Sequence, residues 1–480
     1  MNLENSYASL SKKLYTLLHP VPVKKPKLIV FNESLAHSLS LDLSDYSSQE
    51  LAQIFAGNKI FPGTTPLAQA YAGHQFTHFT TLGDGRAILL GEQVLPNGDR
   101  FDIQLKGSGV TPYSRGGDGR ATLKSMLREY LMSESLHHLG VSSSRSLAVT
   151  CTGEAVYREK KEHGAVLARI MKSHIRIGTF QYVANFLPRQ DLQKFTQYCI
   201  DRLYPQISSS DNPPLALLEA VMHEQIKLII NWMRIGFIHG VMNTDNTSIS
   251  GESFDYGPCS FMNYYNPYAT FSVIDAYKRY AFHHQPHILL WNLYRFAETL
   301  IPLISEDEAK AIDLTYSVLN PYENIFNESY LQMMRNKLGI LDKKESDLKL
   351  VQDLLQCMYK SQSDYTNTFI ELMYPGTLGE PNFYDEDFLS WQTEWKKRVS
   401  GANILPPQSL EIMKNNNPIL IPRSHRIEQA LDQAQEGGNL ELFHSLNEDL
   451  QKPYDFNGYS QAMDPPSKNF DKNYKTHCNT

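Results

Sequence analysis

The sequence predicts an α+β fold of two lobes, in which a strand-rich lobe precedes a helical one. With 480 residues, the chain exceeds what one hydrophobic core usually supports. β-Rich runs begin near Leu82, whereas the chain beyond Phe282 shows helical spacing and loops only. We therefore predict a connecting segment with short helices, a strand-rich lobe, a helical lobe, and a helical extension with a mobile polar tail, at residues 1–60, 61–185, 186–330 and 331–480.

The composition excludes several classes of protein. A hydrophobic content of 41 % with 20 % charged residues is typical of a globular chain rather than a disordered one. The net charge of -7 and the lack of a long Lys/Arg run argue against binding to nucleic acid or to an anionic membrane. The chain has no apolar stretch long enough for a transmembrane helix, no secretory signal, and five scattered cysteines without a CxxC pair. We expect a cytoplasmic protein.

The strand-rich lobe contains a hairpin followed by a glycine-rich loop. Residues 86–95 and 100–106 are β-rich and flank Asn97-Gly98, a pair that suits the positive φ angles of a tight turn. Because side chains alternate along a strand, Lys106 lies on the polar face of the second strand. That face carries Asp102, Gln104 and Lys106, and the opposite face carries Phe101, Ile103 and Leu105.

Five glycines between Lys106 and Arg120 precede a helix that Gly140 ends. Such a loop lets backbone N–H groups converge on an anion at the helix amino terminus. Arg169 and Arg176, further along the chain, add guanidinium groups that can bind phosphate oxygens bidentately. This region therefore predicts a phosphate pocket. We expect two further strands within residues 146–150 and 164–171, and a long helix over residues 215–238 that ends at His239-Gly240.

Signals for phosphate chemistry occur in the order found in protein kinases. Each signal alone is weak, but the ordered set predicts a kinase-like fold, because a strand lysine paired with a helix glutamate orients phosphates there, and an Asn and an Asp hold magnesium. The signals are Gly83-Asp84-Gly85-Arg86, Lys106, Glu129, Asn246 and Asp255.

The segment HGVMNTDN departs from the kinase pattern at one position. Asn246 follows His239 by the seven residues that kinases show, but Val241 holds the place of the catalytic base and cannot accept a proton. Asp245 is the acidic residue that could take over the proton or help to hold a metal ion. We interpret His239 as a packed structural residue, and we expect no metal site at His283, His284 and His287, which no cysteine or carboxylate accompanies.

Several strings resemble the selenoprotein O family, and the resemblance covers nearly the whole chain. They include YAGHQF at 71–76, LGDGRAILLGE at 82–92, LKGSGVTPYSRGGDGRA at 105–121, AVLARIMKSHIRIGTF at 165–180, HGVMNTDN at 239–246 and FDYGP at 254–258. The resemblance implies a pseudokinase fold that binds ATP inverted, with the γ-phosphate buried. AMP then passes to Ser, Thr or Tyr hydroxyls of proteins, the enzyme itself among the possible substrates, and pyrophosphate is released. UMP transfer from UTP is the implied variant for bacterial members.

The resemblance also implies roles for individual residues. Asp245 would be the proton acceptor, Asn246 and Asp255 would bind Mg²⁺ or Mn²⁺, and Glu129 would pair with Lys106. The nucleotide contacts would come from Gly83, Gly85, Arg86, Lys106, Asp118, Gly119, Arg169, Arg176 and Asp255.

Two departures from the family pattern concern Thr77, which replaces a common glycine, and the cysteines. Cys478 stands third from the end, where relatives carry selenocysteine or cysteine. The partner cysteine of some bacterial relatives is absent at Thr270-Phe271-Ser272, which leaves Cys259 as the nearest thiol.

Two rival interpretations remain. A kinase-like phosphotransferase is disfavoured by Val241, and a non-catalytic nucleotide-binding scaffold is disfavoured by the intact Lys106, Asn246 and Asp255. The sequence leaves open the protein substrates, the choice between ATP and UTP, the metal, and the oligomeric state.

Overall fold

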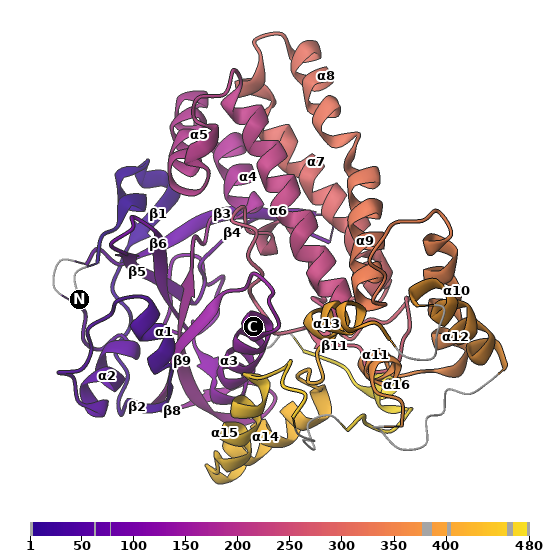
Figure 1. The fold of residues 1–480 in the computed structure, drawn as a ribbon. Coiled ribbons are helices and arrows are strands. Elements are labelled where there is room, and N and C mark those ends of the chain that lie inside the picture. Colours follow the sequence, from indigo (N-terminus) through magenta and orange to yellow (C-terminus); the bar gives the residue numbers. More distant parts are fainter. Residues whose placement is uncertain are drawn as a thin grey trace.

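The chain folds into a sheet lobe joined to a larger body of helices (Figure 1). The computed structural model describes residues 3–61, 64–76, 78–376, 386–400, 405–457 and 464–477. Strands dominate up to Met171 and helices dominate after it, which confirms the predicted α+β class.

Nine antiparallel strands make up the sheet within the described residues. The first 60 residues supply two of them, one at each end of the sheet. The order is β1 (Tyr15–Leu17), β3 (Leu67–Gln75), β5 (Ala87–Val94), β6 (Arg100–Lys106), β9 (Lys161–Met171), β8 (Arg145–Tyr157) and β2 (Lys27–Phe31), with β4 (His78–Gly83) paired to β3 and β7 (Ala121–Thr122) paired to β9.

The predicted hairpin is strands β5 and β6, with Gly98 at φ 91° in its turn. Ile103 and Leu105 lie in a hydrophobic core beneath α1 (Glu33–Ser38) and α2 (Ser48–Phe55). Lys106 points to the opposite face, toward α3 (Leu123–His138), as the alternation predicts. The Thr122 side chain caps the start of α3, and Gly140 at φ 78° follows its end.

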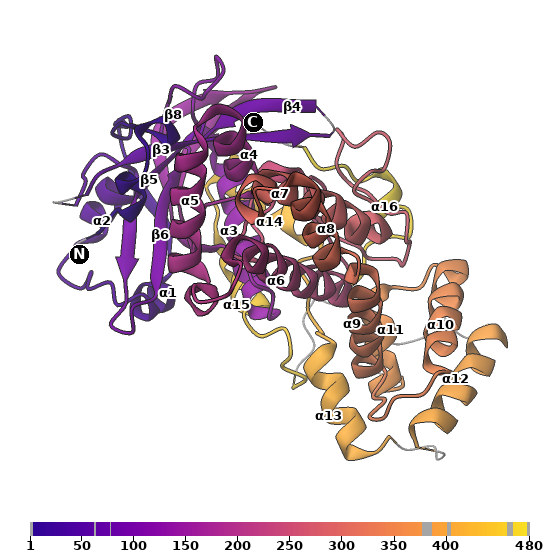
Figure 2. The same ribbon diagram turned by 90° about the horizontal axis from the view of Figure 1, so that it is seen from above.

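The hairpin of β3 and β4 was not predicted, because we expected the strand-rich pattern to begin only near Leu82. Its turn includes Phe76 at φ 59°, a residue that gives no sequence signal for a positive φ angle. Tertiary packing holds it instead: Figure 2 shows the hairpin reaching over the helices, where the His74 ring lies 5.3 Å from the Trp291 ring.

The long helix α6 (Pro213–Ile235) ends earlier than we predicted. Gly236 adopts φ 74° and terminates it, so the expected end at His239-Gly240 is wrong. Phe237–Ile238 instead forms β10, which pairs with β11 (Ser260–Phe261). A glycine at the C-cap relieves the steric cost of a left-handed residue, which explains the earlier stop.

The remaining helices build the second body and also return to the sheet lobe. Helices α14 (Ser424–Gly437) and α15 (Glu441–Leu450) pack against α3 (Figure 1), and Tyr474, near the last described residues, donates a hydrogen bond to Glu428 of α14. Among the described residues, none of these helices has the length and apolar character needed to cross a membrane. They are α4 (Ile177–Phe186), α5 (Arg189–Leu203), α7 (Gln285–Ile304), α8 (Glu308–Leu319), α9 (Tyr322–Lys337), α10 (Asp347–Ser361), α11 (Tyr365–Met373), α12 (Glu386–Val399), α13 (Pro407–Asn416), α14 (Ser424–Gly437), α15 (Glu441–Leu450) and α16 (Phe470–Asn473).

The contact between β3 and α4 gives a test of this arrangement. A Cβ atom on Gly178 would overlap the Ala72 carbonyl oxygen, so Gly178→Ala must push the hairpin away from α4. We expect a loss of about 1–3 kcal/mol in the free energy of unfolding, measured by denaturant titration. Gly437→Ala, which adds a Cβ into open space on α14, is the control and should leave stability nearly unchanged. Equal stabilities of the two variants would contradict the packing.

Candidate active site

A cavity of about 950 Å³ opens beside the polar face of β6. Its walls come from the β4–β5 turn, the glycine-rich loop, α3, β9 and the segments around residues 245 and 255. The cavity collects every site residue that the sequence predicts, although their individual roles stay predictions. These residues are Gly83, Gly85, Arg86, Lys106, Asp118, Gly119, Glu129, Arg169, Arg176, Asp245, Asn246 and Asp255.

Two buried cations and two carboxylates interlock at the base of the cavity. The Lys106 Nζ atom lies 2.5 Å from Glu129 Oε2 and 2.6 Å from Asp255 Oδ1. Arg169 Nη1 contacts the same two carboxylates, at 3.2 Å from Glu129 Oε1 and 2.6 Å from Asp255 Oδ1. The predicted Lys106–Glu129 pair is therefore present, and Asp255 joins it to the second lobe.

The pKa of Asp255 is strongly perturbed by its surroundings. Burial alone would raise its pKa, but the positive charges of Lys106, Arg169 and Arg176 hold the pKa well below the ordinary value. Its backbone adopts φ 63°, a conformation that Asp tolerates better than most side chains do. The side chain stays 26 % exposed, so it remains ionised and open to the cavity.

Arg176 spans the two lobes. Its Nη1 donates to the Asp245 carbonyl oxygen at 3.0 Å, and its Nη2 lies 3.8 Å from Asp84 Oδ1. The guanidinium also packs 4.0 Å from the Tyr71 ring centroid, a cation–π distance. Arg176 is 2 % exposed, so the surrounding contacts fix the position of its charge.

Asp245 has few partners for a buried carboxylate. Its Oδ2 accepts a long hydrogen bond of 3.5 Å from Gln75, and its Oδ1 has no hydrogen-bond partner among the described residues. Burial raises its pKa to about 6, against the opposing effect of Arg176. Gly73 allows β3 to lie close to Asp245, because a Cβ at residue 73 would lie only 2.7 Å from Asp245 Oδ1.

Asn246 and Val241 lie side by side in the same wall of the cavity. The Asn246 side-chain amide donates to the Val241 carbonyl at 3.1 Å. His239 is buried, stacks on Trp232 at 5.3 Å and contacts the Phe254 carbonyl oxygen at 2.9 Å. Its surroundings are those of the packed structural residue that the sequence predicts.

The glycine motifs bring two loops together at the rim. A Cβ on Gly83 would overlap the Tyr113 ring, and a Cβ on Gly119, at φ 65°, would overlap the backbone of Gly109. Asp118 is exposed at this rim and pairs with Arg158 Nη1 at 2.8 Å, which lowers the pKa of Asp118. The rim is thus close-packed backbone with one exposed ion pair.

Three further residues received no individual role in the sequence-based prediction: Asp84 and Tyr71 line the cavity, and Gln104 contacts residues that do. Asp84, inside the Gly-Asp-Gly motif, is buried and accepts from Gln69 N at 3.0 Å and from Gln104 Nε2 at 3.3 Å, and burial raises its pKa to about 6. Gln104 also accepts from Arg169 Nη2 at 2.6 Å. The period-two pattern placed Gln104 on the same strand face as Lys106 but gave it no role. Tyr71 begins the string YAGHQF that carries the family resemblance, but the sequence does not predict its contact with Arg176.

The polar tail makes contacts that its composition does not predict. Thr476 N donates to the Phe271 carbonyl at 2.8 Å, and Thr476 Oγ1 donates to the Pro258 carbonyl at 2.7 Å. Tyr474 donates to Glu428 Oε1 at 2.8 Å, and both tail residues line the cavity. Described residues 464–477 therefore close part of its rim.

Cys259, His283 and His284, to which the sequence gives no role in the site, do not line the cavity. Burial raises the pKa of Cys259 to about 12, which makes it an unreactive thiol. Cys478 and Thr77 lie outside the described residues. The His283 and His284 rings contact the backbone carbonyls of Pro267 and Lys278. The described ranges contain no group of three or more His, Cys, Asp or Glu side chains placed to hold a metal ion by themselves.

Comparison with known proteins decides the family. Residues 1–451 match the family described as protein adenylyltransferase SelO. The chain belongs to this family. It is 47 % identical over 480 residues to a protein nucleotidyltransferase YdiU of Nitrosococcus oceani, covering 100 % of this chain and 97 % of that protein. A Clostridium botulinum protein of the same description is 48 % identical, with 100 % and 98 % covered, and one from Anoxybacillus flavithermus is 47 % identical, with 100 % and 99 % covered. The SelO-family chain is thus a protein nucleotidyltransferase, and its family implies a nucleotide co-substrate.

The charge cluster predicts the effect of two substitutions on nucleotidyl transfer. Lys106→Ala removes the ammonium that two carboxylates orient, and we expect turnover to fall roughly a hundredfold or more. Glu129→Gln keeps a hydrogen-bond acceptor and should cost less. Lys349→Ala, at an exposed lysine on α10, is the control. Steady-state transfer rates measure all three, and a wild-type rate in Lys106→Ala would show that this lysine only supports the strand.

Proposed function

We propose that this enzyme transfers AMP from ATP to Ser, Thr or Tyr hydroxyls of proteins, itself among the candidate substrates, with release of pyrophosphate. UMP transfer from UTP is the proposed variant of the same reaction. One observation carries the proposal: the carboxyl of Asp245 borders a cavity that Lys106, Arg169 and Arg176 make positive, while Val241 fills the place of the kinase base. In this proposal the proton acceptor, Asp245, stands four residues further along the chain than the position of the kinase base.

The proposed scaffold is a two-lobed kinase-like fold. Its support is the order of elements: a strand lysine, a helix glutamate, and then an asparagine and an aspartate from the helical side, all meeting at one cavity. In this proposal, residues 61–185 hold the nucleotide-binding loops and residues 186–330 hold the metal-binding and proton-accepting residues.

Asn246 and Asp255 fit a divalent cation. The Asn246 amide N–H donates to the Val241 carbonyl, so the carbonyl oxygen of the Asn246 side chain stays available. Asp255 is an ionised, partly exposed carboxylate. These are the hard oxygen donors that Mg²⁺ and Mn²⁺ prefer, and Mg²⁺ commonly completes its shell with water and substrate phosphates. When bound, the metal ion supplies positive charge against the phosphate oxygens.

The other residues bind and orient the nucleotide. Lys106, Arg169 and Arg176 offer fixed charges to the phosphates, and the Gly83–Arg86 and Gly107–Gly119 loops offer close backbone approach. The acceptor hydroxyl oxygen bonds to the α-phosphorus, and the bond from this phosphorus to the bridging oxygen breaks. Pyrophosphate leaves with that electron pair. Asp245 takes the hydroxyl proton, a role that suits a carboxylate whose pKa burial has raised.

Separate labelling of ATP at the α- and γ-phosphates tests this reaction. With divalent metal present, the α-label should become protein-bound and the γ-label should leave in pyrophosphate. Adding a chelator should stop the transfer. Asp245→Asn, which keeps the shape of the side chain but removes the proton acceptor, should bind ATP and transfer little label. If the γ-label became protein-bound instead, the enzyme would be a kinase.

A further inference from the structure

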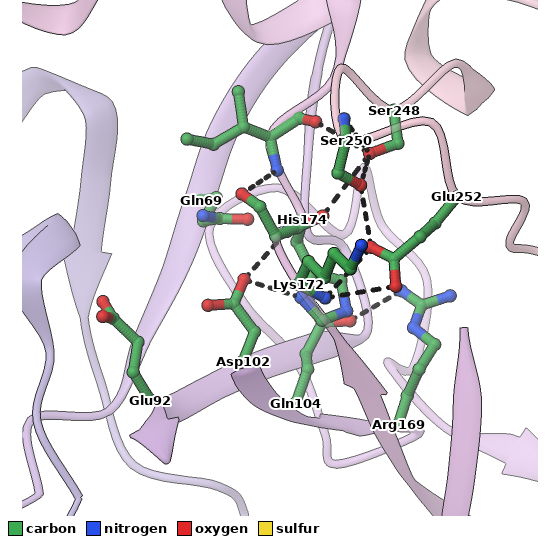
Figure 3. Close-up of polar contacts among 12 residues, drawn as sticks. Gln69, Glu92, Asp102, Gln104, Arg169, Lys172, His174, Ser248, Ser250 and Glu252 are labelled. Carbon is green, nitrogen blue, oxygen red and sulfur yellow. Dashed lines mark hydrogen bonds and ion pairs between the residues drawn. The ribbon is translucent and has the colours of Figure 1, made fainter. Parts of the chain in front are cut away.

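The segment from Lys172 to Arg176 carries the chain from β9 to α4, and buried side chains hold it from both sides (Figure 3). It is the stretch that delivers Arg176 to the cavity. Lys172, Ser173 and His174 do not line the cavity, so the roles proposed above do not explain them.

The helical side holds the segment with a buried carboxylate and a ladder of backbone bonds. Glu252 accepts from Lys172 N at 3.0 Å and from Ser250 Oγ at 2.7 Å. Ile249 N donates to the Ile175 carbonyl at 3.1 Å, and Ile177 N donates to the Thr247 carbonyl at 2.9 Å. These hydrogen bonds attach the loop between Asn246 and Asp255 to the segment that joins β9 to α4.

The sheet side holds the segment through Asp102, which shares the polar face of β6 with Gln104 and Lys106. Asp102 Oδ2 accepts from both His174 N at 2.8 Å and the His174 ring Nδ1 at 3.0 Å. Its Oδ1 accepts from Arg202 Nη2 of α5 at 2.5 Å, and this nitrogen also donates to the Lys172 carbonyl at 2.8 Å. Burial lowers the pKa of His174 to about 4, so the ring is neutral and its proton is assigned to Nδ1 by the carboxylate.

His174 passes this constraint to Arg176. The His174 carbonyl accepts from Arg176 Nε at 3.3 Å, while Nη1 of the same guanidinium donates to the Asp245 carbonyl. The direction of the guanidinium therefore depends on the orientation of the peptide unit that Asp102 fixes through His174. A tilt at His174 would move the charge away from Asp84 and from the Asp245 backbone.

We propose that Asp102 is a positioning residue for Arg176: by binding His174 through both its backbone N–H and its ring, it sets the direction in which the guanidinium enters the nucleotide site. This inference rests on the proposed role of Arg176 in binding nucleotide phosphate. Asp102 itself touches neither the cavity nor the reacting atoms.

Glu92 provides a matched control. It is fully buried and binds the same arginine, with Oε2 at 2.9 Å from Arg202 Nη1. Its other partners are Ser6 and Arg100, so it makes no hydrogen bond or ion pair to the Lys172–Arg176 segment. Removing either carboxylate weakens the same buried charge cluster, but only Asp102 contacts the connection.

A double-mutant cycle on ATP affinity tests the proposal, with binding measured by calorimetry below the melting temperature of every variant. Asp102→Asn should weaken ATP binding about tenfold, the scale of a lost charge-assisted hydrogen bond. In an Arg176→Ala background, the same change should cause little further loss, because a residue that acts through Arg176 has nothing left to position. Glu92→Gln should lower the melting temperature and leave ATP affinity unchanged.

Should Asp102→Asn not fold, His174→Phe repeats the cycle with an aromatic ring kept and the Nδ1 hydrogen bond removed. Losses that add in the double variant, or an Asp102 effect matched by Glu92→Gln, would overturn the proposal and leave Asp102 a purely structural residue.

Amide hydrogen exchange separates this inference from the proposed function. Asp102→Asn should speed exchange at residues 174–177 without nucleotide present, and Glu92→Gln should not. If Arg176→Ala left ATP affinity intact, Arg176 would not bind nucleotide as proposed. The exchange result would still show whether Asp102 holds the Lys172–Arg176 segment. Unchanged exchange in Asp102→Asn would overturn that link.

Discussion

The site depends on the burial of Lys106 between two carboxylates that come from different parts of the chain. Glu129 arrives on α3 and Asp255 on the loop after Asn246, and Arg169 of β9 bridges both. Removing one member of such a buried cluster leaves an unpaired charge in a region of low dielectric, which costs far more than the loss of a surface pair. The cluster therefore fixes the sheet, α3 and the second lobe relative to one another.

The arrangement leaves positive charge where a polyphosphate can use it. Arg176 shares in the stabilisation of Asp255 but makes its own contacts to Asp84 and to the backbone of Asp245. Lys106, Arg169 and Arg176 are all held by protein groups before any substrate arrives. Little reorganisation of these cations is therefore needed when phosphates bind. Asp245 lies beside Arg176, its Oδ1 has no hydrogen-bond partner among the described residues, and burial raises its pKa, an environment that suits a proton acceptor.

Sequence reasoning found the parts of the site that local rules determine. The alternation along β6 placed Lys106 opposite Ile103 and Leu105, and the seven-residue spacing from His239 located Asn246. It did not find the hairpin of β3 and β4, whose turn at Phe76 is held by contacts to Asn243 and the helical body. It also missed two hydrogen bonds, from His174 to Asp102 and from Thr476 to the Pro258 carbonyl, which join residues 72 and 218 positions apart. Such contacts depend on how the lobes dock, and no local propensity encodes them.

The orientation of the bound nucleotide is the central claim, because it decides which phosphate meets Asp245. A crystal structure of the enzyme with a non-hydrolysable ATP analogue and Mn²⁺ measures it directly. We expect the γ-phosphate to lie buried and the α-phosphate to face Asp245, with the metal ion between the phosphates and the oxygens of Asn246 and Asp255. A γ-phosphate directed at Asp245, with the adenine buried instead, would contradict the account.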